Sequence, residues 1–233
     1  MKRIIKISLI LLLVGMAVIA TVPFLKEKRA EKKYENDFKK IQESVTEKKS
    51  DVNGLVKKNK DCIGYVEIPG TTISYPVMQT KDKPDFYLNH DFNRNYSFYG
   101  TPYLSAYCDV EKSDNLIIYG HNINGGKMFG ALEQYKDKEF FYKHRKIYFT
   151  TDKKREYEVF AVMCVNIHKF EYWKFVMAKD EKEYDEFVDK VEEHSSWRQE
   201  NKPKYGEQML MLSTCDNGKG DDWRIVVIGV MQQ

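Results

Sequence analysis

The hydrophobic positions divide the chain into an apolar N-terminal run, a charged segment and a strand-rich remainder. Residues 7–25 carry no charged side chain, and as a helix they span about 28 Å, close to the ~30 Å hydrocarbon core of a bilayer. We therefore expect a retained membrane anchor over residues 1–25. A cleavable signal peptide is the alternative, because Val18-Ile19-Ala20 is a passable small-x-Ala cleavage site.

Residues 26–60 are rich in charge, and their apolar side chains recur at helical spacing. Tyr34, Phe38, Ile41 and Val45 follow one another at intervals of four, three and four residues. This spacing places them on one face of an amphipathic helix. We expect a charged helical extension that packs on the domain after it.

From residue 61 to residue 233 the pattern is that of short strands separated by turns, which we take as one domain. Apolar runs flank Pro69-Gly70, a dipeptide typical of a turn. Because no regular helix separates successive runs, a closed or nearly closed, mainly antiparallel barrel of about eight strands is favoured over a parallel α/β sheet. The runs are 63–68, 72–77, Thr101–Tyr107, Asn115–Tyr119, Lys146–Thr150, Tyr157–Ile167, Gln208–Ser213 and Trp223–Met231.

Two helices are expected among these strands. Asp180 and Glu183 have the spacing of a capping box, with Asp in place of Ser or Thr. The apolar face of the helix that follows comprises Tyr184, Phe187, Val188 and Val191. A shorter helix is expected over Met128–Tyr135, just after the Gly125-Gly126 turn.

The net charge and the cysteine spacing exclude some classes of function. The formal net charge is only +3, so the chain has no strong nucleic-acid footprint. Its cysteines are Cys62, Cys108, Cys164 and Cys215, and no two are spaced as a CxxC redox or zinc pair. Buried free thiols are therefore the default for most of them. The sequence contains no residue cluster that demands a metal, and no cofactor is expected.

Cys215 is the best-placed nucleophile. It ends an apolar strand and precedes a polar, glycine-containing loop, residues 216–222, where a substrate can reach it. A free thiol, with a pKa near ~8.5, is mostly protonated at neutral pH and needs a base. His121 also ends an apolar strand, after Gly120, whereas the other four histidines lie among charged or aromatic residues.

Arg224 is the third candidate. It lies nine residues after Cys215, so antiparallel pairing across the intervening loop would place it near the thiol. A guanidinium there can donate hydrogen bonds to a developing oxyanion and favour a thiolate. A salt bridge to Asp221 or Asp222 is the alternative role.

Three motifs, in this order, resemble those of the sortase family. They are Tyr119-Gly120-His121-Asn122, Leu212-Ser213-Thr214-Cys215 and Arg224-Ile225-Val226-Val227. Ser213 stands where many sortases carry Thr, a form typical of class B. The charged extension, the Gly-Lys-Met-Phe-Gly-Ala-Leu segment from Gly126 and the helix around Tyr184–Val191 strengthen the class B resemblance.

The resemblance implies an eight-stranded sortase barrel, with N-terminal helices and a helix between the last strands. It also implies a single-pass membrane protein, anchored through residues 7–25, whose catalytic domain lies outside a Gram-positive-type membrane. The flanking basic residues alone do not give this orientation.

The implied reaction is a transpeptidation of surface-protein precursors. Cys215 would attack the Thr carbonyl of a C-terminal sorting signal, Asn-Pro-x-Thr-Asn-like or Pro-x-Thr-Gly-like, and a cell-wall precursor or peptidoglycan amine would resolve the thioacyl intermediate. His121 would protonate the leaving amine and deprotonate the incoming one, and Arg224 would support the oxyanion. The residues implied in substrate binding are Tyr119, Ser213, Asn89, Tyr172 and Trp173.

There are two alternative functions. A hydrolytic cysteine peptidase would use Cys215, His121 and Arg224 with water in place of the amine. A membrane-anchored wall or adhesion protein that kept only the barrel would use none of them. Product analysis with and without an amine acceptor separates the first, and thiol labelling tests the second.

Overall fold

The computed structural model describes residues 52–232 without a gap and isolated positions before them. Those positions are 6, 12, 15–17, 19, 21–26, 28, 29, 32, 33, 35, 36 and 39. Among all these residues, no helix combines the length and the apolar character needed to cross a membrane. More than half of the anchor expected over residues 1–25, and the apolar face expected from Tyr34 to Val45, lie outside the described residues.

The chain separates into two compact units, residues 1–49 and 50–233. The second unit opens with the short helix α2 (Val52–Lys58), whose Val52 and Leu55 side chains are buried. The main chain then turns directly into the first strand, since Cys62 N–H donates to Asn59 O.

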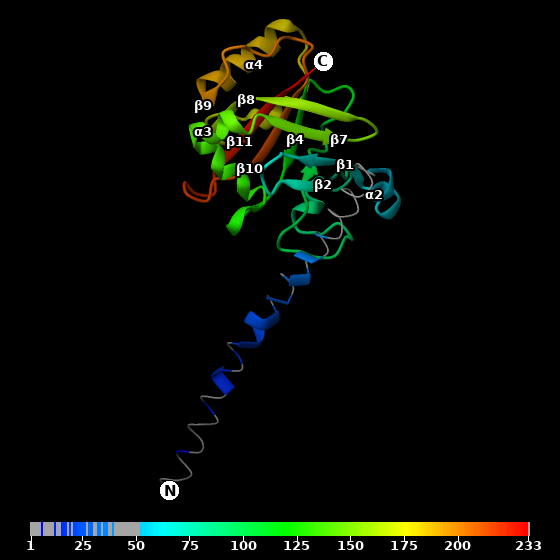
Figure 1. Ribbon diagram of the computed structural model, residues 1–233, viewed down its shortest axis with the longest axis vertical. Coiled ribbons are helices and arrows are strands. Elements are labelled where there is room, and N and C mark those ends of the chain that lie inside the picture. Colours follow the sequence, from blue (N-terminus) through cyan, green and yellow to red (C-terminus); the bar gives the residue numbers. More distant parts are fainter. Residues whose placement is uncertain are drawn as a thin grey trace. The chain divides into compact units, whose positions relative to one another are not determined.

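Nine strands form one hydrogen-bonded sheet in the described part of the chain (Figure 1). Their order is β11-β10-β4-β3-β2-β1-β7-β8-β9, and β11 also pairs with β8. That extra pairing closes the sheet, and the strands other than β9 make an eight-stranded barrel. The strands are β1 (Cys62–Glu67), β2 (Ser74–Met78), β3 (Tyr103–Leu104), β4 (Asn115–Tyr119), β7 (Lys146–Thr150), β8 (Lys154–Asn166), β9 (Ser195–Arg198), β10 (Met209–Cys215) and β11 (Trp223–Met231).

The expected eight-stranded barrel is confirmed, but two of its details differ. Two neighbouring pairs, β10–β4 and β2–β3, are parallel, so the barrel is mixed. The strand expected over Thr101–Tyr107 ends at Leu104, because a turn follows in which Cys108 N–H donates to Ser105 O. The additional strand β9 pairs with β8 only.

The barrel core explains the longest apolar runs of the sequence. Leu116, Ile117 and Ile118 of β4 are fully buried, as are Met209–Leu212 of β10. Strands that are covered on both faces read as continuous apolar segments instead of alternating ones. Parallel pairing between β4 and β10 therefore fits the composition of both strands.

The helix expected after Asp180 is confirmed as α4 (Glu181–Glu193). The Asp180 carboxylate accepts from Glu183 N–H at 2.9 Å, and Glu183 accepts in return from Lys179 N–H at 2.8 Å. The four predicted apolar positions are all buried. The shorter helix differs from expectation, because a 3-10 helix, η3 (Gly130–Lys136), is followed by a separate helix, α3 (Lys138–Lys143), capped by Asp137.

The remaining elements are short. They are the 3-10 turns η1 (Phe86–Leu88), η2 (Asn124–Gly126) and η4 (Tyr172–Lys174), and the two-residue strands β5 (Asn122–Ile123) and β6 (Lys127–Met128), which pair with each other.

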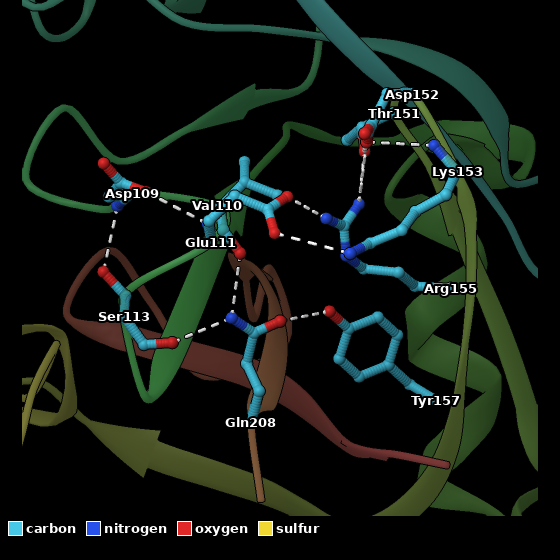
Figure 2. Close-up of polar contacts among 10 residues, drawn as sticks. All are labelled: Asp109, Val110, Glu111, Ser113, Thr151, Asp152, Lys153, Arg155, Tyr157 and Gln208. Carbon is cyan, nitrogen blue, oxygen red and sulfur yellow. Dashed lines mark hydrogen bonds and ion pairs between the residues drawn. The ribbon is translucent and has the colours of Figure 1, made fainter. Parts of the chain in front are cut away.

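A polar cluster holds the end of the barrel at which β10 begins (Figure 2). The buried Arg155 of β8, 5% exposed, bonds Glu111 and Thr151. Gln208 donates to Val110 O at 2.9 Å and to Ser113 O at 2.8 Å. The cluster thus ties the loop before β4 to the β7–β8 hairpin and to the start of β10.

Candidate active site

The parallel register of β4 and β10 brings the first two candidate residues to one end of the barrel. Ser213 lies opposite Tyr119, and Cys215 and His121 each follow two residues later. The strand ends are fastened together, because Gly120 N–H donates to Ser213 O at 3.1 Å and Thr214 Oγ1 donates to Gly120 O at 2.7 Å.

Arg224 joins them through the antiparallel pairing of β10 with β11. Cys215 and Arg224 occupy directly opposite positions in that register. Opposite residues of an antiparallel pair project from the same face of the sheet, with Cβ atoms about 4.5–5.5 Å apart. The structure therefore brings Cys215, His121 and Arg224 together at one edge, and all three are partly exposed.

The His121 ring is held from the β2–β3 connection. Its Nε2 lies 2.8 Å from Leu88 O, and because a carbonyl oxygen only accepts, Nε2 carries the hydrogen. The exposed Phe98 ring lies nearly parallel to it, at an interplanar angle of 6° and a centroid distance of 6.5 Å. No hydrogen bond between His121 and the Cys215 thiol is recorded among the described residues.

Arg224 binds main-chain oxygens. Its Nη1 donates to Asp221 O at 2.5 Å and to Trp223 O at 2.9 Å. The ion pairs of residues 52–232 give it no carboxylate partner, and Asp222 instead lies 3.5 Å from His168 Nε2. Both recorded bonds use one nitrogen of the guanidinium, whose fork offers five N–H donors in all.

The four thiols differ in their surroundings. Burial raises the pKa of Cys62 to about 12 and that of Cys108 to about 11, so both are neutral at physiological pH. Cys164 lies within β8 and is partly exposed. Burial also raises its pKa. Cys215 is the partly exposed thiol at a strand end.

The residues implied in substrate binding lie in three settings. Ser213 and Tyr172 are buried, and their hydroxyls are 2.7 Å apart. Tyr119 and Trp173 are partly exposed, and Asn89 is exposed. Burial raises the pKa of Tyr172 to about 12, and a hydrogen bond from Ser213 opposes the shift.

Tyr103 is a further residue of this face that the sequence did not single out. It lies opposite Tyr119 in the β3–β4 pairing, with ring centroids 5.5 Å apart. Its hydroxyl donates to Asp85 at 3.1 Å. The sequence placed Tyr103 in a predicted strand, but it gave no register to set it beside Tyr119.

No metal centre is apparent in the part of the chain that the structure describes. None of its groups of three or more His, Cys, Asp or Glu side chains is arranged to hold a metal ion. The groups gathered at this edge are a thiol, an imidazole and a guanidinium.

Comparisons with known proteins agree with this arrangement. A family model described as "Sortase domain" matches residues 66–232. The chain is 28% identical to sortase B of Staphylococcus aureus, an alignment that covers 98% of this chain and 96% of the relative.

Two solved structures are similar over most of their length. A Staphylococcus aureus sortase B–substrate complex is 26% identical with a TM-score of 0.77, covering 90% of this chain and 99% of that one. A sortase B complexed with triglycine is 27% identical with a TM-score of 0.76, covering 89% and 99%.

Proposed function

The chain belongs to the sortase family, as a homologue of the sortase B cysteine transpeptidases, and from this premise we propose its substrates and its catalytic residues. It cleaves a C-terminal sorting signal after a threonine and transfers the protein to a cell-wall amine. The supporting observation is the pairing of Cys215 with Arg224 beside the strand end that carries His121.

In the first half-reaction the Cys215 sulfur attacks the threonine carbonyl carbon after its proton has passed to Nδ1 of His121. A C–S bond forms, and the carbonyl electrons move to oxygen, where the Arg224 guanidinium donates hydrogen bonds. The C–N bond then breaks, and His121 protonates the leaving amine. Because Nε2–H of His121 faces Leu88 O, Nδ1 is the nitrogen that exchanges this proton.

In the second half-reaction an amine attacks the thioacyl carbon and gives its proton to His121. The new C–N bond forms, the C–S bond breaks, and Cys215 leaves as a thiolate. The similarity to a sortase B complexed with triglycine supports a primary amine at the end of a small, flexible peptide as acceptor. The similarity to a sortase B–substrate complex supports a peptide signal on the acyl side.

The sorting signal is of the Asn-Pro-x-Thr-Asn or Pro-x-Thr-Gly type, and its donors are surface-protein precursors. Tyr119, Ser213, Asn89, Tyr172 and Trp173 shape the groove that receives it. Since Ser213 and Tyr172 are buried and bonded to each other, they act by setting the groove wall. The domain acts outside the membrane, to which residues 7–25 anchor it.

The test is product analysis with the full chain in detergent. A labelled Asn-Pro-x-Thr-Asn peptide is supplied with and without triglycine, and products are identified by mass spectrometry. We expect a conjugate of the threonine carbonyl with triglycine when the amine is present, slow hydrolysis without it, and no reaction for Cys215→Ala. Hydrolysis at the same rate with and without triglycine would identify a cysteine peptidase instead.

A further inference from the structure

A chain of four polar side chains joins the segment after His121 to the segment after Cys215. Asn122 Nδ2 donates to Cys215 O at 2.8 Å and to Glu133 Oε1 at 2.7 Å. Lys136 Nζ lies 2.6 Å from Glu133 Oε2 and 2.8 Å from Asp216 Oδ1. This series of contacts thus begins at the Cys215 carbonyl and ends at Asp216, the next residue along the chain.

Of the four side chains, the Asp216 carboxylate is the one whose burial depends most on a partner. Its side chain is fully buried, and a buried carboxylate costs on the order of several kcal/mol unless it is paired and hydrogen-bonded. Within the described residues Lys136 is its recorded ion-pair partner. Gly218 N–H donates to Oδ1 at 3.2 Å, whereas Oδ2 has no recorded hydrogen-bond partner in that part of the chain.

Lys136 is held through its main chain as well as through its ammonium group. Its carbonyl oxygen accepts from the Trp197 indole N–H of β9 at 3.0 Å. Partial burial lowers the pKa of its ammonium, but the hydrogen bonds to Asp216 and Glu133 outweigh this, and the net direction is upward. The side chain therefore stays charged at the pH at which a thiol titrates.

We propose that Lys136 is a positioning residue for the reaction at Cys215, where it neutralises Asp216 and, through Glu133 and Asn122, holds the two reacting strand ends in register. The proposal rests on the proposed function, in which Cys215 and His121 react together. Lys136 itself need not touch substrate.

Two physical effects follow from this arrangement. An unpaired carboxylate one residue from Cys215 would repel a developing thiolate. Loss of Lys136 would also free Glu133 and so loosen the Asn122 amide from the Cys215 carbonyl.

Other charged or titratable groups face the same strand end. They are Arg224 of β11 opposite Cys215, Tyr103 of β3, Tyr172 of η4, Cys164 of β8, Lys219 of the following loop and, by the proposed mechanism, His121. Because these groups are unchanged in a Lys136 variant, a shift in the alkylation midpoint of Cys215 is assignable to Lys136 and the two carboxylates that it pairs with.

The test is the pH profile of Cys215 alkylation by iodoacetamide in the full chain, resolved by peptide mass spectrometry. For Lys136→Met we expect the midpoint to rise by about one pH unit, which is about tenfold slower alkylation near neutral pH. Lys136→Arg should stay near the parent, and Lys136→Met combined with Asp216→Asn should return toward it. Lys146→Met, which removes an exposed lysine paired with Glu156, is the matched control.

If Lys136→Met does not fold, Asp216→Asn alone decides the question, because it removes a negative charge beside Cys215 while Lys136 stays paired with Glu133, and it should lower the midpoint. Unchanged midpoints in folded Lys136→Met or Asp216→Asn would overturn the proposal. Alkylation does not depend on transpeptidation, so a parent chain that forms no triglycine conjugate would instead count against the proposed function.

Discussion

Replacing Arg224 by lysine separates a catalytic role of the guanidinium from a role in holding the adjacent loop. Arg224 lies opposite Cys215, and its Nη1 donates to Asp221 O and Trp223 O. The loop role is thus visible in the structure, and the catalytic role is a proposal. Lysine keeps the positive charge and can reach one carbonyl, but it lacks the planar fork.

The two roles predict effects of different size. Loss of an oxyanion donor reduces turnover on the order of 10²–10³-fold, about 2.7–4 kcal/mol of transition-state stabilisation. Two hydrogen bonds at a partly exposed site contribute about 0.5–1.5 kcal/mol each to folding. In a domain of this size each kcal/mol lowers the melting temperature by about 2–4 °C.

We therefore expect Arg224→Lys to lose about 100-fold in kcat/KM while its melting temperature falls by only a few degrees. The assay is cleavage of a quenched fluorescent sorting-signal peptide, alongside thermal unfolding. Arg145→Lys is the matched control, since Arg145 pairs with Glu158 near the other end of β11, and it should keep parental turnover.

The result that would refute this reasoning is near-parental turnover in both Arg224→Lys and Arg224→Ala. Arg224 would then serve only the loop, and the oxyanion donors would have to be main-chain amides near Cys215.

Three further predictions concern other residues of the barrel. Glu111→Ala removes a partner of the buried Arg155, so urea unfolding should show that the free energy of unfolding falls by about 1–3 kcal/mol. Turnover per folded molecule should not change, and a change would contradict the view that the Arg155 cluster is separate from the active site. Gly120→Ala places a methyl group 2.8 Å from the buried Phe129 ring. The variant should lose about 1–3 kcal/mol in free energy of unfolding and most of its activity, and parental stability would contradict the predicted clash. At pH 8 iodoacetamide should modify Cys215 before Cys62 and Cys108. A thiol is neutral below its pKa, and burial raises the pKa of Cys62 to about 12 and that of Cys108 to about 11. Earlier modification of Cys62 or Cys108, detected by peptide mass spectrometry, would count against Cys215 as nucleophile.

Local patterns predicted most elements of the barrel domain. The runs Asn115–Tyr119, Lys146–Thr150 and Trp223–Met231 match β4, β7 and β11 residue for residue. The cap at Asp180 set the start of α4. These features depend on side chains close together in sequence, which is why sequence alone could identify them.

The sequence alone does not predict the contacts that join Asn122, Glu133, Lys136 and Asp216. Glu133 and Lys136 are three residues apart, a spacing that on any helix suggests an ordinary surface pair. Their connection to Asn122 and Asp216 spans 11 and 80 residues respectively. It exists only because the barrel brings η3 against the end of β10, and no periodicity reports such a contact.

The relative direction of β4 and β10 decides whether the candidate residues can act together. Cys215 ends β10, and His121 lies two residues beyond the end of β4, so antiparallel pairing would set His121 beside the start of β10. Six strand residues at about 3.3 Å each would then separate it from Cys215 by about 20 Å, too far for proton transfer. Parallel pairing, with Ser213 opposite Tyr119, removes that distance. A parallel pair needs a long connection, and the segment between the strands supplies it with β7, β8 and α4. The expectation of a mainly antiparallel barrel did not contain this feature, although the proposed chemistry requires it.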